Sequence, residues 1–102
     1  TVYVDKTIQQ YIIHLVSQTR EHPLIYLGVS PRGSLALMKA AKALAYINGR
    51  DYVIPDDVKF LAPYIMGHRI LLTSEARYDG ETNDSVIENI IKTTHIPIRK
   101  EF

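Results

Sequence analysis

The chain has no cysteine and no tryptophan among its 102 residues. The lack of cysteine excludes disulfide bonds, a thiolate nucleophile and thiolate metal ligands together. Such a composition fits the reducing cytoplasm, and we expect a cytoplasmic protein. Long apolar runs are missing too: no stretch approaches the roughly 18 residues of a membrane span, and the N-terminus lacks the basic-then-apolar order of a signal peptide. We therefore expect no membrane partner.

Charge is balanced rather than concentrated in one sign. The 12 basic and 11 acidic residues give a formal net charge of +1 and are mixed along the sequence. Specific binding to nucleic acid normally carries a clear basic surplus, so we expect no nucleic acid partner. No metal site is expected, because the histidines are far apart and show no ligand spacing. They are His14, His22, His68 and His95.

The remaining composition is that of one ordinary globular unit. Hydrophobic residues make up 46% and charged residues 23% of the chain. A single domain of this length buries an adequate but thin core, so its stability can depend on a neighbouring unit. The first residue is Thr1 rather than methionine, and residues 1–4 already read as ordered sequence. We therefore expect residues 1–102 to be one domain of a longer protein.

Hydrophobic spacing and helix-capping residues predict two helices in the first half of the chain. The first follows Asp5, a good N-cap, and ends before Pro23, because a proline pushes the preceding residue out of helical geometry. The second opens at Ser30-Pro31, where the serine side chain accepts a bond from a free amide and the proline suits the first helical position. It ends at Gly49.

Two more helices are predicted in the second half. The third opens at Pro55 with acidic residues in its first turn, where the helix dipole favours them, and Pro63 should kink it. Pro97 ends the fourth, and Arg99-Lys100 read as a solvated terminus. The candidate caps of the fourth helix are Thr82, Asn83 and Asp84, and its apolar side consists of Val86, Ile87, Ile90 and Ile91.

The connections between the helices should hold little regular structure. Residues 24–27 are predicted to be a short apolar connection, and the polar residues 73–84 a flexible loop with an Asp79-Gly80 turn. Residues 52–54 and 69–73 are candidate short strands that can pair with each other. The predicted fold class is mostly α, a four-helix bundle with a small two-stranded β element.

One motif points to chemistry, the segment GVSPRG at residues 28–33. It places Arg32 in the first turn of a helix, where free amides and the helix dipole already favour an anion. An arginine there costs dipole energy, a local conflict that is typical of functional positions. Because a guanidinium holds phosphate oxygens through paired hydrogen bonds, Arg32 suits a nucleotide γ-phosphate. The alternative interpretation is a structural ion pair with an acidic residue.

The sequence around this motif indicates a family more specifically than the motif does by itself. Over about residues 3 to 73, the order and spacing of five blocks resemble the C-terminal helical lid subdomain of MoxR-type AAA+ ATPases. The blocks are Thr19-Arg20-Glu21-His22-Pro23, residues 28–32, Gly49-Arg50-Asp51-Tyr52-Val53, Pro55-Asp56-Asp57-Val58 and His68-Arg69.

The resemblance implies a role for each residue of the motif. Arg32 would be the sensor 2 arginine, which reaches the γ-phosphate of ATP bound on the neighbouring α/β subdomain. Gly33 would let the nucleotide or that subdomain come close. The family more often has alanine near Val29 and Gly33, which are small departures. The nucleotide-binding residues implied in this way are Gly28, Ser30, Pro31, Arg32 and Gly33.

The catalytic core of such an ATPase is not in this chain, because no GxxxxGK[ST] phosphate loop is found. Asp56-Asp57 does not replace its acidic pair, since these residues stand where a helix N-terminus favours acid. We expect the fragment to be inactive and to hold no cofactor tightly. The parent is expected to hydrolyse ATP with Mg²⁺.

The resemblance also implies partners for the lid. It would contact the upstream AAA+ nucleotide-binding subdomain and neighbouring subunits of a homo-oligomeric ring, expected to be a hexamer. The ring would drive chaperone-like remodelling, and its partners would include von Willebrand factor A domain proteins. Two other classes compete with this interpretation. One is a helical protein-interaction module that docks a partner through its Ala-rich second helix. The other is a helix-turn-helix DNA-binding unit with residues 31–48 as its recognition helix.

Overall fold

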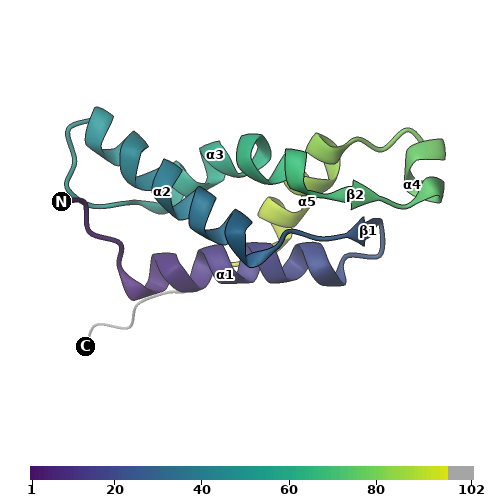
Figure 1. Cartoon of the computed structure of the whole chain (residues 1–102), viewed down its shortest axis with the longest axis horizontal. Helices are drawn as coiled ribbons and strands as arrows, with labels where there is room; N and C mark the ends of the chain where they lie inside the picture. Colours follow the sequence, from purple (N-terminus) through teal and green to yellow (C-terminus); the bar gives the residue numbers. More distant parts are fainter. Residues whose placement is uncertain (97–102) are drawn as a thin grey trace.

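The computed structural model describes residues 1–96, and the predictions for Pro97 and Arg99-Lys100 lie outside them. The described residues form an elongated helical unit of about 44 × 31 × 20 Å (Figure 1). In chain order its elements are α1 (Lys6–Glu21), β1 (Ile25–Leu27), α2 (Pro31–Ile47), α3 (Pro55–Met66), the 3₁₀ turn η1 (Gly67–Arg69), β2 (Leu71–Leu72), α4 (Ser74–Tyr78) and α5 (Asn83–Thr93).

The helices run roughly along the long axis, and α2 crosses α1 obliquely (Figure 1). The two strands and α4 gather at one end of the unit, whereas the α2–α3 connection and the N-terminus lie at the other. This arrangement confirms the predicted fold class, mostly helical with a small two-stranded sheet. The start of α2 lies near the middle of the unit, between α1 and the sheet.

The core is built from the apolar sides of α1, α2, α3 and α5. Helix α1 contributes large side chains, whereas α2 buries Leu37 together with the small Ala41 and Ala45. These small residues allow the backbone of another helix to approach closely, and α2 makes its most extensive contact with α3. The buried hydrophobic residues of α1 are Ile8, Tyr11, Ile12, Leu15 and Val16.

One of the two predicted strands is confirmed, because β2 lies within residues 69–73, but its partner is not residues 52–54. Strand β2 runs antiparallel to β1, with Ile25 opposite Leu72 and Leu27 opposite Leu71, so residues 24–27 are not a mere connection. Residues 52–54 pair with the N-terminal segment of the chain instead of with residues 69–73. Tyr3 forms a parallel bridge with Tyr52 there. The Val53 amide donates to the Tyr3 carbonyl at 3.0 Å.

The described residues contain five α-helices rather than four. The extra one, α4, lies in residues 73–84, where a flexible loop was predicted. Thr73 caps it by accepting a hydrogen bond from the Ala76 amide at 3.1 Å, and Ala76 is buried. The turn after it is as predicted, since Gly80 has a φ of +88° that glycine adopts without strain. Helix α3 continues through Pro63 to Met66.

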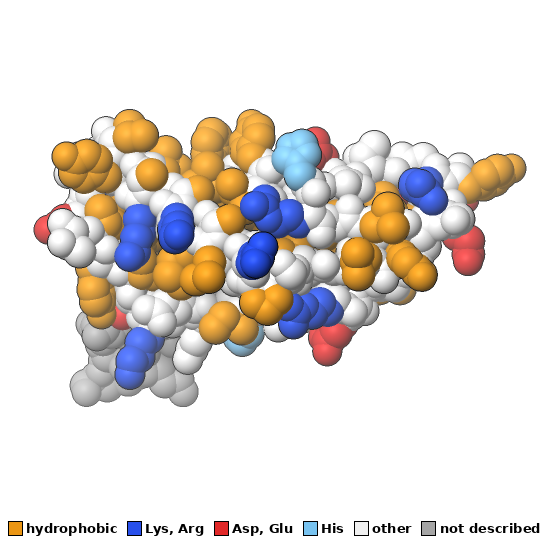
Figure 2. All heavy atoms as spheres, in the orientation of Figure 1, with side chains coloured by type: hydrophobic (Ala, Val, Ile, Leu, Met, Phe, Trp, Pro, Cys, Tyr) orange, Lys and Arg blue, Asp and Glu red, His pale blue; other side chains and the backbone are white. Residues whose placement is uncertain are grey.

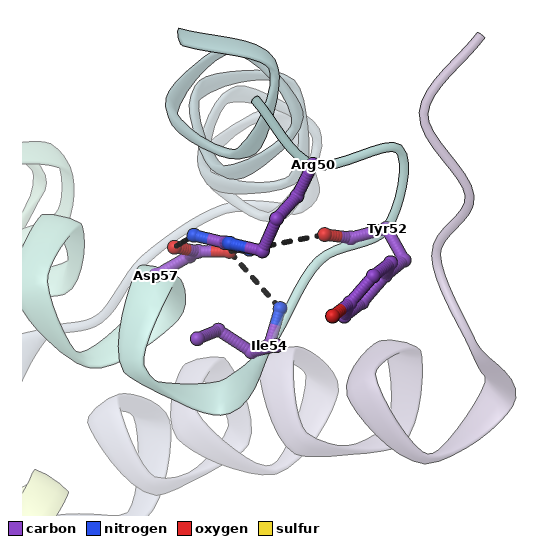
Figure 3. A network of polar contacts seen from close by, with 4 residues as sticks. All are labelled: Arg50, Tyr52, Ile54 and Asp57. Atoms are coloured by element: carbon purple, nitrogen blue, oxygen red, sulfur yellow. Dashed lines mark hydrogen bonds and ion pairs between the residues drawn. The ribbon is translucent and has the colours of Figure 1, made fainter. Parts of the chain in front are cut away.

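The corner between α2 and α3 is closed by a polar network (Figure 3). Arg50 donates from Nη1 and Nη2 to the two carboxylate oxygens of Asp57, at 2.7 and 2.6 Å. Asp57 also accepts a hydrogen bond from the Ile54 amide at 3.0 Å and so caps α3, as predicted. Arg50 thus joins the end of α2 to the first turn of α3 through an ion pair. The hydrogen bonds from the Arg50 guanidinium and the Ile54 amide hold the pKa of Asp57 below its ordinary value.

Candidate functional site

Arg32 is the second residue of α2, and its side chain is exposed to solvent. The first turn of α2 contains no acidic residue. Within residues 1–96 the ion pair is that of Arg50 with Asp57, and no carboxylate pairs with Arg32. The alternative interpretation, a structural ion pair, is therefore not found in the described part of the chain. The guanidinium is free to meet a group from outside it.

The start of α2 is capped differently from the prediction. Ser30 occupies the N-cap position and Pro31 the first helical position, as expected. The Ser30 side chain, however, makes no capping hydrogen bond within residues 1–96. Its backbone carbonyl instead accepts from the Gly33 amide at 2.9 Å. The serine hydroxyl, which the prediction had assigned to capping, is exposed beside Arg32.

Val29, three residues before Arg32, is fully buried and held by α1. Its amide donates to the Thr19 hydroxyl oxygen at 2.9 Å. Its carbonyl accepts from Arg20 Nε at 3.0 Å. Both backbone polar groups of Val29 are thus satisfied by side chains from the last turns of α1. The segment before Arg32 is fastened to α1 at this residue.

Gly28 lies against the same part of α1. A Cβ atom on Gly28 would lie 2.8 Å from the Thr19 carbonyl oxygen and 2.9 Å from Arg20 Cα. Real Cβ atoms do not approach backbone atoms this closely, so a side chain at position 28 would push the segment away from α1. The glycine is required by a close approach of two backbones rather than by a positive φ.

Gly33, in the first turn of α2, is buried against Val29 and Arg69. Arg69 passes over it: its Nη1 donates to the Ile65 carbonyl at 2.9 Å, and its Cδ lies 3.1 Å from where a Cβ on Gly33 would be. Arg69 therefore links the end of α3 to the first turn of α2. The groups that approach Gly33 in this chain are Val29 and Arg69, and an approach by another subdomain stays a prediction.

Three exposed arginines surround the first turn of α2, namely Arg20, Arg32 and Arg69. None of them pairs with a carboxylate within the described residues. Figure 2 shows Lys and Arg side chains along the middle of this face, with acidic side chains near its edges. Positive charge without counter-charge, at the positive end of a helix dipole, attracts an anion. The arrangement suits a polyphosphate.

The sequence predicted part of this site. Residues 28 and 30–33 lie together at the start of α2 because they are contiguous. The contributions of Thr19, Arg20 and Arg69 were missed, although these residues stand in two of the matched blocks. The signal that could have found Thr19 is a threonine on the apolar side of a predicted helix, where a buried hydroxyl needs a partner.

Among the described residues, no histidine is hydrogen-bonded to the residues at the start of α2. His22 accepts from the Leu24 amide at 3.1 Å and meets Asn89 at 3.4 Å, and it thereby ties the end of α1 to α5. His68 is exposed and lies beside Asn83 and Asp84 at the start of α5. Over residues 1–96, no group of three or more His, Cys, Asp or Glu side chains could hold a metal ion. No helix in that range is long and apolar enough to cross a membrane.

Comparison with known proteins places these features in a family. Residues 17–90 match the model of the AAA lid domain. The uncharacterized protein YeaC of Bacillus subtilis (strain 168) is 46% identical over 97% of this chain and 31% of its own length. Chaperone MoxR1 of Mycobacterium tuberculosis is 34% identical over 93% of this chain and 28% of its own length.

The fold has a solved counterpart as well. The crystal structure of a candidate ATPase from Cytophaga hutchinsonii matches with a TM-score of 0.89 and 36% identity, over 95% of this chain and 32% of that one. The chain thus spans about a third of the length of these relatives. The match covers Thr19, Arg20, the segment before Arg32 and Arg69. The chain belongs to the AAA lid domain family and is a lid of the MoxR type.

Proposed function

We propose that this lid senses the γ-phosphate of ATP through Arg32 and couples ATP hydrolysis to chaperone-like remodelling by a longer MoxR-type AAA+ protein. The observation that carries the proposal is the state of Arg32. Its guanidinium is exposed at the start of α2 and pairs with no carboxylate within residues 1–96. An unpaired arginine at the positive end of a helix dipole is suited to an anion that arrives from another part of the protein.

The anchoring of the segment supports sensing rather than loose attraction. Arg32 follows Val29, which is buried and hydrogen-bonded to α1 through both backbone groups. A guanidinium stabilises developing charge on a phosphate only when it is already in position. Gly28, Ser30 and Pro31 set the path of the chain to Arg32, and Gly33 keeps its first turn close to Arg69.

A phosphate ligand fits these residues better than a metal ion does. The three arginines and the acid-free first turn of α2 suit the charge of ATP. Mg²⁺ would arrive on the phosphates and be held by the nucleotide-binding subdomain, which we propose as the partner of this lid. Of the residues that we assign to the nucleotide, Ser30, Pro31 and Arg32 are exposed and would face ATP, whereas Gly28 and Gly33 would act through the close packing that positions them.

The wider function rests on relatives. One relative is named a chaperone, and this supports remodelling as the task of the parent. Assembly into a ring, expected to be a hexamer, with von Willebrand factor A domain partners remains part of the proposal, as does a cytoplasmic location.

The competing interpretations have less support. Of the five alanines of α2, Ala41 and Ala45 are fully buried inside this unit, Ala36 and Ala40 are half-buried, and Ala43 alone is exposed to a docking partner. The feature that supports a protein-interaction role lies on α3 instead. Phe60 and Tyr64 are 60% and 64% exposed, with their ring centroids 5.8 Å apart. Exposed aromatic pairs of this kind are common in protein interfaces.

The test is ATP hydrolysis by the full-length protein with Arg32→Ala. We expect kcat to fall by about 10²-fold, the usual effect of removing one preorganised donor to transition-state charge. Arg77→Ala is the matched control, because Arg77 is also an exposed arginine but lies on α4, at one end of the unit and away from the start of α2. Equal turnover in the wild type and Arg32→Ala would overturn the proposal and leave the lid as a structural or docking module.

A further inference from the structure

Thr19 is a buried polar residue whose hydroxyl has a fixed direction. It donates to the Val16 carbonyl at 2.6 Å within α1. Since a hydroxyl has one proton, its oxygen can only accept from the Val29 amide, 2.9 Å away. Thr19 is fully buried, and in the described part of the chain Asp57 is the other buried polar or charged side chain. The hydroxyl is therefore committed to one external partner, the Val29 amide.

The position would suit an apolar residue if packing alone mattered. Thr19 lies on the buried side of α1 with Leu15 and Val16, and a valine has nearly the same shape as a threonine. Burying a hydroxyl costs free energy unless it is hydrogen-bonded. The contact that it makes beyond its own helix reaches the segment that leads to Arg32. What the hydroxyl adds over a methyl group is thus the attachment of this segment to α1.

The backbone between Val29 and Arg32 has little conformational freedom. Only Ser30 and Pro31 intervene, and the ring of Pro31 fixes its φ. The Gly33 amide is hydrogen-bonded to the Ser30 carbonyl, which closes the first turn. Arg20 holds the other polar group of Val29, its carbonyl, at 3.0 Å. A shift of Val29 away from α1 would therefore displace Arg32 with it.

We propose that Thr19 is a positioning residue for the nucleotide site, with Arg20 as its helper: the two fix the place of Val29 on α1 and thereby the place of Arg32. The inference rests on the proposed function, because it requires Arg32 to act on ATP. Helix α1 becomes the reference against which the lid arginine is aligned. Neither Thr19 nor Arg20 needs to touch the nucleotide for this role.

The experiment is a double-substitution cycle in the full-length protein, read as kcat and KM for ATP. Thr19→Val removes the acceptor and keeps the shape. We expect it to lower kcat about tenfold and to change KM for ATP less than twofold, since a small misplacement of a positioning group acts mainly on the chemical step. Thr19→Ser retains the hydroxyl and should restore most of the turnover.

The second background separates positioning from general damage. In Arg32→Ala, the further substitution Thr19→Val should leave kcat unchanged, because Thr19 acts through Arg32. An equal loss in both backgrounds, or no loss in the wild-type background, would overturn the inference. If Arg32→Ala alone has no effect, the proposed function itself fails, and the two failures are thus distinguishable.

A second substitution covers the case in which Thr19→Val does not fold. Arg20 is exposed, so the Arg20→Lys variant should fold. The substitution removes the Nε–H group that donates to the Val29 carbonyl, and it keeps the positive charge. We expect a threefold to fivefold lower kcat that again disappears in the Arg32→Ala background. Full turnover by Arg20→Lys, when Thr19→Val cannot be prepared, would contradict the inference.

Discussion

The Cγ1 atom of Val29 fills the space that a Cβ atom on Gly33 would need. The larger side chain at position 29 is accommodated by the missing one at position 33. The two positions are therefore complementary in size, and this part of the chain has no room for a second side chain.

This close contact predicts that Gly33→Ala destabilises the lid, although alanine is the better helix former. The added methyl group overlaps Val29 Cγ1 and lies 3.1 Å from Arg69 Cδ. We expect a loss of about 1–3 kcal/mol in the free energy of unfolding, typical of overpacking. Urea denaturation of the 102-residue chain measures it.

Two further variants sharpen the result. Val29→Ala combined with Gly33→Ala should recover most of the loss, because the variant lacks the Cγ1 atom that overlaps the added methyl group. Gly67→Ala is the matched control, since its Cβ would meet only Asp84 Oδ1 at 3.4 Å, an ordinary contact. Equal stability of wild type and Gly33→Ala, or no recovery in the double variant, would show that the two positions are independent.

The pKa of Asp57 predicts how stability depends on pH. Hydrogen bonds from Arg50 and from the Ile54 amide lower this pKa below its ordinary value of 3.8. The stabilisation is therefore complete above the unfolded-state pKa and is lost as the pH falls through the lower folded-state value. Asp57→Asn should cost about 2 kcal/mol at pH 7, and the difference from wild type should shrink below about pH 4.

Asp56→Asn is the control for this measurement. Asp56 lies in the same first turn of α3 but is exposed, so we expect an effect within about 0.5 kcal/mol. Urea denaturation at several pH values between neutral and acid gives the comparison. A gap between Asp57→Asn and wild type that stays constant down to acid pH would contradict the assigned linkage.

Tyr11 carries a prediction at the alkaline end. Its hydroxyl is buried and has no hydrogen-bond partner among the described residues. Burial, together with the charge of Asp56, raises its pKa. The folded state thus favours the neutral phenol, and stability should fall as the pH rises past the lower pKa of the unfolded chain.

Removing this hydroxyl should be harmless or stabilising. We expect Tyr11→Phe to raise the free energy of unfolding by up to about 1 kcal/mol at pH 7, because no buried group loses a partner. The gain should grow above about pH 10, which thermal unfolding at neutral and alkaline pH can follow. A clearly less stable Tyr11→Phe would mean that the hydroxyl is bonded in solution.

Helix ends were the most predictable part of the fold, because the signals are local. Pro23 ends α1, Ser30-Pro31 starts α2, and Gly49, with a φ of +78°, follows its end. Of the two strands, β2 lies within the predicted residues 69–73, whereas β1 and the pairing were not predicted. Residues 25–27 form a strand because residues 71–72 lie beside them, and nothing within either segment specifies the other. Helix α4 spans five residues, too few for a hydrophobic period to show.

In the candidate site, too, the local motif was predictable from the sequence and the long-range contacts were not. Arg32 was predicted because its motif is contiguous and opens a helix. The contacts that hold it in place join Val29 to Thr19 and Gly33 to Arg69, residues ten and 36 positions apart in the chain. Such contacts depend on how α1, α2 and η1 pack together. A sequence pattern indicates the reactive group, whereas its support becomes visible only in three dimensions.

The most direct test of the account compares two nucleotides on the full-length protein. Affinities for ADP and for a non-hydrolysable ATP analogue are measured by calorimetry for wild type and Arg32→Ala. If Arg32 reads the γ-phosphate, the substitution weakens the analogue about tenfold, the effect of one charge-assisted hydrogen bond of about 1.4 kcal/mol, and leaves ADP unchanged. Equal losses for both nucleotides, or none for either, would contradict the account.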